Sequence, residues 1–317
     1  MLIKKEKKGN IDVYHVDKNI SDEKMEKLKN TFVKRDQIDL FIKSDADIYD
    51  ANGNMLLRFR KNKLTKNAVD EFYDNVIDFA KKKSTNRGSA SGSKQKNVED
   101  NPKIMSNILG YMDGFSPRQK YIMNLQKKKI DLNVRETRFN MDYPDKFKKL
   151  LPMIRGIDKY YKQYAPIYYK KQRRKADQTN FKIPGTSFTT ITTNVNFQTS
   201  IHKDNGDDEE GFGNLTVIDH GKYTGGETCF PQYGIGVDVR RGDVLFMNVH
   251  EWHGNLPMKK EGKDVIRLSV VCYLRIKVWK DTIGINKNAM TKHNLTIKNM
   301  RGGGGTSCGN NKTLKRK

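Results

Sequence analysis

The chain has 317 residues, of which 35% are hydrophobic, enough for one large domain with additions or for two domains. Its 61 Lys and Arg against 37 Asp and Glu give a formal net charge of +24, and such an excess favours polyanionic partners. Three cysteines without Cys-x-x-Cys spacing, and apolar runs too short to span a bilayer, exclude a disulfide framework, a thiolate zinc site and a membrane protein. We therefore expect a soluble, intracellular protein with nucleic acid as its large partner, although a generally basic solvated surface would carry the same charge.

Residues 1–83 have the pattern of a small α/β unit. Ser21 caps a predicted helix that ends near Thr31, and Asn52-Gly53 predicts a tight hairpin between two short strands. A second helix is predicted over residues 65–82, because its apolar residues recur at helical spacing. These residues are Val69, Phe72, Val76, Phe79 and Ala80. We expect this stripe to be core rather than a binding surface.

Residues 84–100 are rich in Ser, Gly, Asn, Lys and Arg, which predicts a flexible basic linker or loop. A basic loop of this kind could instead become ordered on a nucleic-acid backbone. Helical patterning follows over residues 103–176, where tyrosines within 160–169 lie next to a run of cations. Aromatic rings beside cations suit base stacking and phosphate contacts. The tyrosines could equally pack a helix onto a sheet while the lysines face water.

From residue 181 to residue 277 the pattern changes to about eight short apolar segments separated by Gly, Asn and Asp, which predicts a sandwich or jelly roll. The predicted strands are residues 188–194, 197–203, 213–219, 227–230, 236–239, 243–248, 254–258 and 265–277. We predict an α+β fold in which residues 101–280 combine supporting helices with a double-stranded β-helix (jelly roll) core. Residues 281–317 are predicted to form a disordered, basic, Gly-rich tail.

The most informative motif is His202-Lys203-Asp204, followed by His253. Two imidazoles and one carboxylate form the facial triad by which non-heme Fe(II) oxygenases hold iron. Residues i and i+2 of a strand point to the same face, so His202 and Asp204 should project together while a distant strand supplies the third ligand. We choose His253 because Gly254 leaves the ligand room, and His250 is kept as the alternative.

A second H-x-D sequence, His15-Val16-Asp17, lies in the charged N-terminal segment and has no later histidine in step with it. We interpret this copy as structural. Its presence shows that the three-residue motif carries little weight without its context.

Arg267 and Ser269 form another i, i+2 pair on the last long strand, so both should face the interior while Leu268 packs outward. A guanidinium with a nearby hydroxyl makes a good fork for a carboxylate, which predicts an anchor for a dicarboxylate cosubstrate. The alternative for Arg267 is a salt bridge to Asp243 or Glu227.

Five short motifs follow one another in a fixed order. They are His202-x-Asp204, Gly225-Gly226-Glu227, Gly242-Asp243, His253-Gly254 and Arg267-x-Ser269. This set resembles the 2-oxoglutarate and Fe(II)-dependent dioxygenases, and most resembles their TET/JBP-like branch, whose members hydroxylate the methyl group of 5-methylcytosine or thymine in nucleic acid. The resemblance covers about residues 130–277, and residues 1–100 have no comparable match.

The resemblance implies that His202, Asp204 and His253 hold Fe(II), that Arg267 and Ser269 bind the far carboxylate of 2-oxoglutarate, and that dioxygen is the second cosubstrate. Decarboxylation to succinate would accompany hydroxylation of a C–H bond. A base in a DNA duplex must be flipped into the pocket, and Asn205 is carried over as a base contact. Residues 207–210 are all acidic and would repel phosphate unless this loop turns away from DNA. A DNA substrate would place the enzyme in the nucleus or elsewhere with DNA.

Other functions stay open. A prolyl or lysyl hydroxylase of the same superfamily would carry the same triad and arginine, but the basic charge favours nucleic acid. A non-catalytic nucleic-acid-binding jelly roll would bind DNA in a salt-dependent way without releasing succinate. Zinc held by His202, His250 and His253 would leave Arg267 without a role. The sequence predicts no particular oligomeric state.

Overall fold

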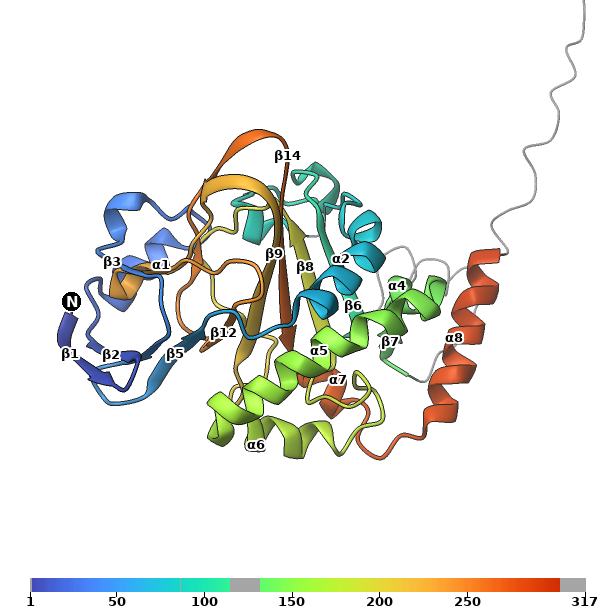
Figure 1. Cartoon of the computed structure of the whole chain (residues 1–317). Helices are drawn as coiled ribbons and strands as arrows, with labels where there is room; N and C mark the ends of the chain where they lie inside the picture. The colour runs from blue at the N-terminus through green and yellow to red at the C-terminus, as the bar shows by residue number, and fades with distance from the viewer. Residues whose placement is uncertain (1, 86, 115–131, 303–317) are drawn as a thin grey trace, which may run out of the picture.

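Two facing sheets form the centre of the molecule in the computed structural model, which describes residues 2–85, 87–114 and 132–302 (Figure 1). In spatial order, the strands of the ten-stranded sheet are β1 (Leu2–Lys8), β2 (Ile11–Val16), β4 (Ala46–Tyr49), β5 (Met55–Arg60), β12 (Val244–Met247), β9 (Gly213–Gly225), β14 (Met258–Tyr273), β8 (Thr190–Val195), β6 (Ser106–Asp113) and β7 (Val134–Glu136). The four-stranded sheet has the order β13 (Gly254–Asn255), β10 (Thr228–Phe230), β11 (Ile235–Val237) and β3 (Leu40–Ile42).

Helices α2 (Lys66–Ala80) and α5 (Pro144–Tyr164) pack in the core on the outer face of the large sheet, whereas α1 (Asp22–Leu28) packs on the side of the small sheet through Met25. The other helices are α4 (Arg138–Asp142), α6 (Pro166–Ala176), α7 (Ile276–Lys280) and α8 (Lys287–Gly302). Figure 1 shows α5 crossing in front of β9 and β14, and α2 in front of β8 and β6. The apolar stripe predicted for α2 is buried along its whole length and packs with Leu268, Val270 and Cys272 of β14, which confirms it as core. No helix in the described ranges is both long enough and apolar enough to span a bilayer.

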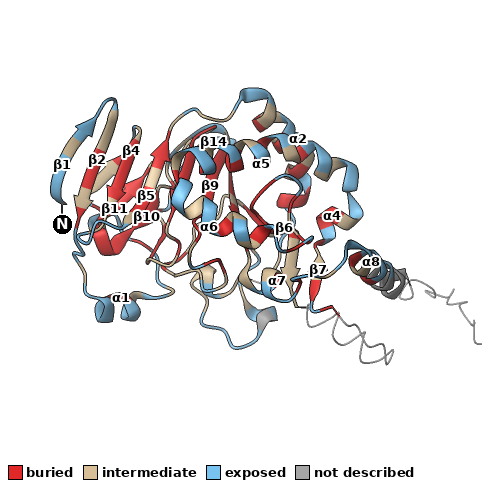
Figure 2. Cartoon of the chain, turned by 90° about the horizontal axis from the view of Figure 1, so that it is seen from below, coloured by how far each residue is buried: buried red, intermediate tan, exposed pale blue. Residues whose placement is uncertain are grey.

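The second core lies between the two sheets. Leu215 and Val217 of β9 and Leu245 of β12 point inward and meet Phe230 and Val237 of the small sheet. Ile218 points the opposite way, into the layer beneath the helices, as the two-residue period of a strand requires. Figure 2 shows the buried residues concentrated in these strands. The predicted α+β fold with a jelly-roll core and supporting helices is therefore confirmed.

The N-terminal residues extend the large sheet. The predicted hairpin is confirmed as β4 and β5, and Ser21 caps α1 by accepting a hydrogen bond from the Lys24 amide at 3.3 Å. Strand β5 pairs antiparallel with β12, from Val244 opposite Arg60 to Met247 opposite Leu57. The division of the chain at residues 83, 100 and 280 stays a prediction, and strands from both sides of the first boundary share one sheet.

Two predicted elements are wrong. Helical patterning was expected from residue 103, but residues 106–113 form β6, because pairing with β8 satisfies the backbone there and Gly110 adopts a φ of 85°, outside the helical region. The expected strand 197–203 is extended chain with a single bridge between His202 and His253. Residues 115–131 of the predicted helical stretch lie outside the described residues.

The C-terminal part differs from the prediction as well. The last strand ends at Tyr273, and residues 276–280 form α7 instead of continuing it. Residues 287–302 of the predicted tail form α8, whereas residues 303–317 lie outside the described part of the chain.

Candidate active site

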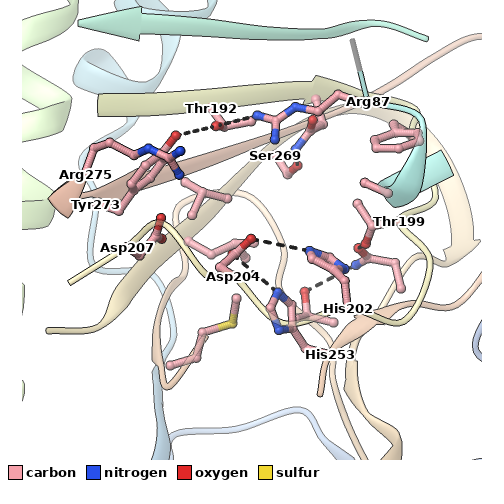
Figure 3. A pocket seen from close by; sticks show the side chains of 18 of the residues that line it. Arg87, Thr192, Thr199, His202, Asp204, Asp207, His253, Ser269, Tyr273 and Arg275 are labelled. Atoms are coloured by element: carbon pink, nitrogen blue, oxygen red, sulfur yellow. Dashed lines mark hydrogen bonds and ion pairs between the residues drawn. The ribbon is translucent and has the colours of Figure 1, made fainter. Parts of the chain in front are cut away.

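His202, Asp204 and His253 meet at one end of a cavity between the sheets (Figure 3). The Nε2 atom of His202 lies 3.7 Å from Asp204 Oδ1, and Nε2 of His253 lies 3.6 Å from Asp204 Oδ2. One ligand atom from each residue lies within 4.8 Å of the other two. Atoms that each bind one ion at about 2.1 Å are roughly 3.0–3.5 Å apart, so a small inward movement would complete a metal site. The residues present fit an iron centre of two histidines and one carboxylate.

Backbone pairing brings these residues together. The His202 amide donates to the His253 carbonyl at 2.9 Å, and the His253 amide donates back at 3.0 Å. A Cβ on Gly254 would lie 3.1 Å from the Ser200 carbonyl oxygen, tighter than ordinary packing. Glycine at position 254 therefore makes room for the Ser200 backbone, which in turn lies next to the His202 ring.

The tautomers of both histidines suit metal binding. Nδ1 of His202 lies 2.7 Å from the Ser200 carbonyl, and Nδ1 of His253 lies 2.9 Å from the Glu251 carbonyl. A carbonyl only accepts, so each Nδ1 carries the proton and each Nε2 presents its lone pair toward Asp204. Burial lowers the pKa of His253 to about 4, helped by the neighbouring His202. A neutral imidazole at physiological pH is the form that binds a metal.

The other candidate histidines lie elsewhere. His250 Nε2 is 3.3 Å from the Asp208 carbonyl oxygen and is not part of the His202, Asp204 and His253 group. His15 stacks on Tyr49, with ring centroids 5.5 Å apart, and lies 3.5 Å from Glu6. The H-x-D copy at the N-terminus thus has a structural environment.

The remaining walls of the cavity carry both polar and apolar side chains. Figure 3 shows Arg87, Thr192, Asp207, Tyr273 and Arg275 around the space above the triad. The apolar lining includes Leu215, Met247 and Val271. This combination can hold a flat ligand that has a hydrogen-bonding edge and a hydrophobic edge.

Asp207 and Arg275 were not identified from the sequence. Asp207 is 8% exposed, and burial, with help from Asp204, raises its pKa well above the usual range, although Arg275 opposes this shift. Arg275 forms an ion pair with Asp113 at 2.6 Å. The i, i+2 rule that selected Ser269 continues through Tyr273 to Arg275, so the signal for this arginine was present.

Arg267 and Ser269 face the same side of β14 but line different spaces. Ser269 lines the triad cavity, and Arg267 lines a neighbouring cavity that shares Phe197 and Asn255 with it. The Arg267 side chain is almost fully buried, which lowers its pKa, and its Nη2 atom has no hydrogen-bond partner among the described residues. A buried, unsatisfied guanidinium nitrogen suits an anionic ligand.

Arg267 forms no ion pair with a carboxylate among the described residues. The alternative prediction, a salt bridge from Arg267 to Asp243 or Glu227, is therefore wrong. Asp243 accepts hydrogen bonds from the amides of Asn62 and Arg240 instead. A Cβ on Gly226 would lie 3.1 Å from Arg267 Nε, and the φ of Gly226 is +76°. Glycine in the Gly-Gly-Glu motif therefore gives the arginine its space.

Two carboxylates of the acidic run after the triad, Asp208 and Glu210, are paired with lysines of α6. Lys175 forms ion pairs with Asp208 and, at 2.8 Å, with Glu210, and Lys171 lies 3.3 Å from Glu210. These carboxylates thus do not repel a ligand at the cavity. The nearby tyrosines are packed: Tyr161 is fully buried, and its hydroxyl accepts a hydrogen bond from the Phe212 amide at 2.8 Å.

Asn205 lies outside the triad cavity. Its exposed side chain lines a second, open groove next to Lys203 and Trp252. Its place is therefore at the entrance rather than beside the metal-binding atoms.

Residues 121–276 match the family model described as the oxygenase domain of the 2OGFeDO superfamily. The chain carries an oxygenase domain of this superfamily. The chain is 34% identical over 168 residues to the bifunctional helicase and thymine dioxygenase JBP2 of Leishmania major, and 32% identical over 148 residues to the thymine dioxygenase JBP1 of Trypanosoma brucei brucei. These matches cover 53% and 46% of the chain but only 14% and 17% of the relatives.

The fold has a solved counterpart. The structure of NgTET1 in complex with 5mC DNA matches with a TM-score of 0.51 and 15% sequence identity, and covers 86% of this chain and 99% of that chain. At this identity the match supports the fold alone. The oxygenase domain thus combines a TET-like jelly roll with a triad whose three residues lie inside the segment matched by the family model.

Proposed function

We propose that the protein is an Fe(II)- and 2-oxoglutarate-dependent dioxygenase that hydroxylates the C5 methyl group of thymine or 5-methylcytosine in DNA. The observation that carries this proposal is the convergence of His202 Nε2, His253 Nε2 and the Asp204 carboxylate, with both Nδ1 atoms held by backbone carbonyls. The thymine dioxygenases among the relatives support a thymine substrate.

In this proposal the chain's own residues bind and orient the reactants. His202, Asp204 and His253 would hold the iron, while Arg267 would pair with the far carboxylate of 2-oxoglutarate and Ser269 would donate to it. Together with dioxygen, the bound iron and 2-oxoglutarate would supply the oxidising chemistry that converts a C–H bond to C–OH and releases succinate and carbon dioxide. Leu215 and Met247 form part of the apolar wall of this space.

The cavity walls support a methylated pyrimidine as the substrate. A flipped pyrimidine presents a methyl group and a Watson–Crick edge with both donors and acceptors. Leu215, Met247 and Val271 offer an apolar contact for the methyl group. Burial raises the pKa of Asp207 and so favours its protonated form. A protonated carboxyl group can both donate and accept a hydrogen bond at the base edge. Asn205 would contact the strand at the entrance.

The decisive test is a product assay. Iron-loaded protein is incubated with 2-oxoglutarate and either prolyl and lysyl peptides or duplexes that contain thymine, 5-methylcytosine or neither, and succinate, nucleosides and peptides are measured by mass. Hydroxymethyluracil or hydroxymethylcytosine together with stoichiometric succinate supports the proposal. A modified prolyl or lysyl peptide, with unmodified DNA, would support the protein-hydroxylase alternative instead. Salt-dependent DNA binding without succinate would support a non-catalytic binding protein. A DNA-modifying activity would place the protein where DNA is, the nucleus included.

A further inference from the structure

The groove next to the triad has walls from the N-terminal part of the chain. It is lined by Lys29 and Asn30 at the end of α1, by residues 87–90, and by His202, Lys203, Asn205 and Trp252. Its volume of about 540 Å³ falls in the range of ligand pockets, roughly 300–1,000 Å³. Lys29 and Arg87 lie outside the segment that matches the oxygenase family model, so this wall is a separate property of the chain.

Backbone hydrogen bonds fix both N-terminal walls to the segment that carries His202. The Asn30 amide donates to the Ile201 carbonyl at 2.9 Å, and the Ile201 amide donates to the Thr31 carbonyl at 2.7 Å. On the other side, the Ser200 amide donates to the Ala90 carbonyl at 2.8 Å. The groove is therefore built onto the backbone of the triad rather than placed beside it by chance contacts.

The groove is lined by more cations than carboxylates. Lys29, Arg87 and Lys203 face one acid, Glu26, which lies 2.9 Å from Lys29. None of the ion pairs among the described residues involves Arg87 or Lys203. The Lys203 ammonium instead lies 5.0 Å from the centre of the Trp252 ring. The charges of Arg87 and Lys203 therefore remain available to an anion, whereas Lys29 shares its charge with Glu26.

The groove adjoins the triad cavity. Arg87, Ala90 and His202 line both of them, and the Arg87 Nη2 donates to Thr192 Oγ1 inside the cavity at 3.1 Å. A chain of phosphates in the groove would thus pass directly by the mouth of the cavity. Lys, Arg and Asn side chains are the usual ligands of nucleic-acid phosphates and sugars.

We propose that this groove, formed by the end of α1 and residues 87–90 against Lys203, binds the phosphate backbone of the strand whose base enters the triad cavity. The inference rests on the proposed action on nucleic acid and gives the N-terminal unit a part in it. Lys29 and Lys203 would each neutralise one phosphate, and Arg87 would lie where the nucleotide leaves the backbone path.

The test compares two charge reversals on the same helix. Lys29→Glu and Lys27→Glu change the net charge equally, but Lys27 is 75% exposed, pairs with Glu23 and does not line the groove. Binding of a labelled duplex is measured by fluorescence anisotropy at several salt concentrations, and melting temperatures confirm folding. We expect Lys29→Glu to weaken binding at least fivefold more than Lys27→Glu and to lower the slope of log K against log salt by about 1. Lys203→Gln should act in the same direction.

Other outcomes overturn the inference in distinguishable ways. Equal losses for Lys29→Glu and Lys27→Glu would mean that general charge attracts DNA, and wild-type binding by both variants would mean that DNA lies elsewhere. Equal competition by polyglutamate would point to an acidic peptide as the occupant. If any of these results is obtained and the wild-type protein still oxidises DNA, only the inference about the groove is overturned and the proposed function stands. Groove-dependent binding without oxidation would refute the proposed function alone, and absence of DNA binding would refute both.

Discussion

Replacing Arg267 with methionine separates cosubstrate binding from stability. The guanidinium is buried and one of its nitrogens has no hydrogen-bond partner among the described residues, so the unliganded protein gains little from its charge. Two charge-assisted hydrogen bonds to a carboxylate contribute about 3–6 kcal/mol in total, at about 1.5–3 kcal/mol each. Their loss should weaken 2-oxoglutarate binding by a factor of about 10² to 10⁴. Methionine is also apolar and fits a buried site without a desolvation penalty.

The assay is thermal unfolding with and without 2-oxoglutarate, in the presence of a metal that does not support turnover. Wild-type protein at a cosubstrate concentration 100 times its Kd should gain about 2.7 kcal/mol of stability. The Arg267→Met variant should melt at or above the wild-type temperature without cosubstrate and should show no gain when it is added. Isothermal titration of 2-oxoglutarate gives the change in Kd directly.

Arg240→Met is the matched control, because it also replaces an arginine with methionine. Arg240 lies 4.3 Å from the centre of the Tyr223 ring and, unlike Arg267, forms an ion pair, with Asp238 at 2.6 Å. This control should lose stability while it keeps its affinity for 2-oxoglutarate. The reasoning is refuted if Arg267→Met binds 2-oxoglutarate as tightly as the wild type and melts at a lower temperature. Arg267 would then be a structural residue.

Three further predictions concern the metal, a buried acid and a buried hydroxyl. His253→Ala should lower bound iron and activity by more than about 100-fold, while His250→Ala keeps both by metal analysis and succinate assay; equal losses would contradict the ligand assignment. Burial raises the pKa of Asp207, so this carboxyl group binds a proton more tightly in the folded protein than in the unfolded chain. The stability of the protein should therefore fall as pH rises from about 4 toward the raised pKa. Asp207→Asn should therefore raise the melting temperature of the metal-free protein at neutral pH but not below about pH 4, and a loss at neutral pH would count against this. Tyr161→Phe removes the acceptor for the Phe212 amide and should cost about 1–3 kcal/mol in urea unfolding, whereas the half-buried Tyr160→Phe should cost much less; equal costs would argue against that hydrogen bond.

The sequence predicted the elements that depend on local pattern. The α2 stripe, the hairpin at Asn52-Gly53 and the Ser21 cap all follow from spacing or turn chemistry within a few residues. The triad residues were chosen by the same means, since two histidines and an aspartate in that order are informative even at a separation of 49 residues. Their roles as metal ligands stay predictions.

Non-local contacts decided the rest. Strand β6 exists because β8 pairs with it, and no pattern within residues 106–113 shows that partner. The acidic run and the cations of α6 looked like separate surfaces, but Lys175 reaches Asp208 across 33 residues and neutralises it. The groove beside the triad likewise joins Lys29 to Lys203 through backbone bonds that only the folded chain reveals.

The pairing of β5 with β12 limits where the chain can be truncated without exposing an edge of the large sheet. A chain cut at residue 100 would keep every triad residue, yet it would leave β12 as a bare edge with unpaired amides and carbonyls. Exposed edges of this kind recruit other strands and promote aggregation. Any related chain that lacks the first 83 residues must therefore cover β12 in another way, with a strand of its own or with a partner protein.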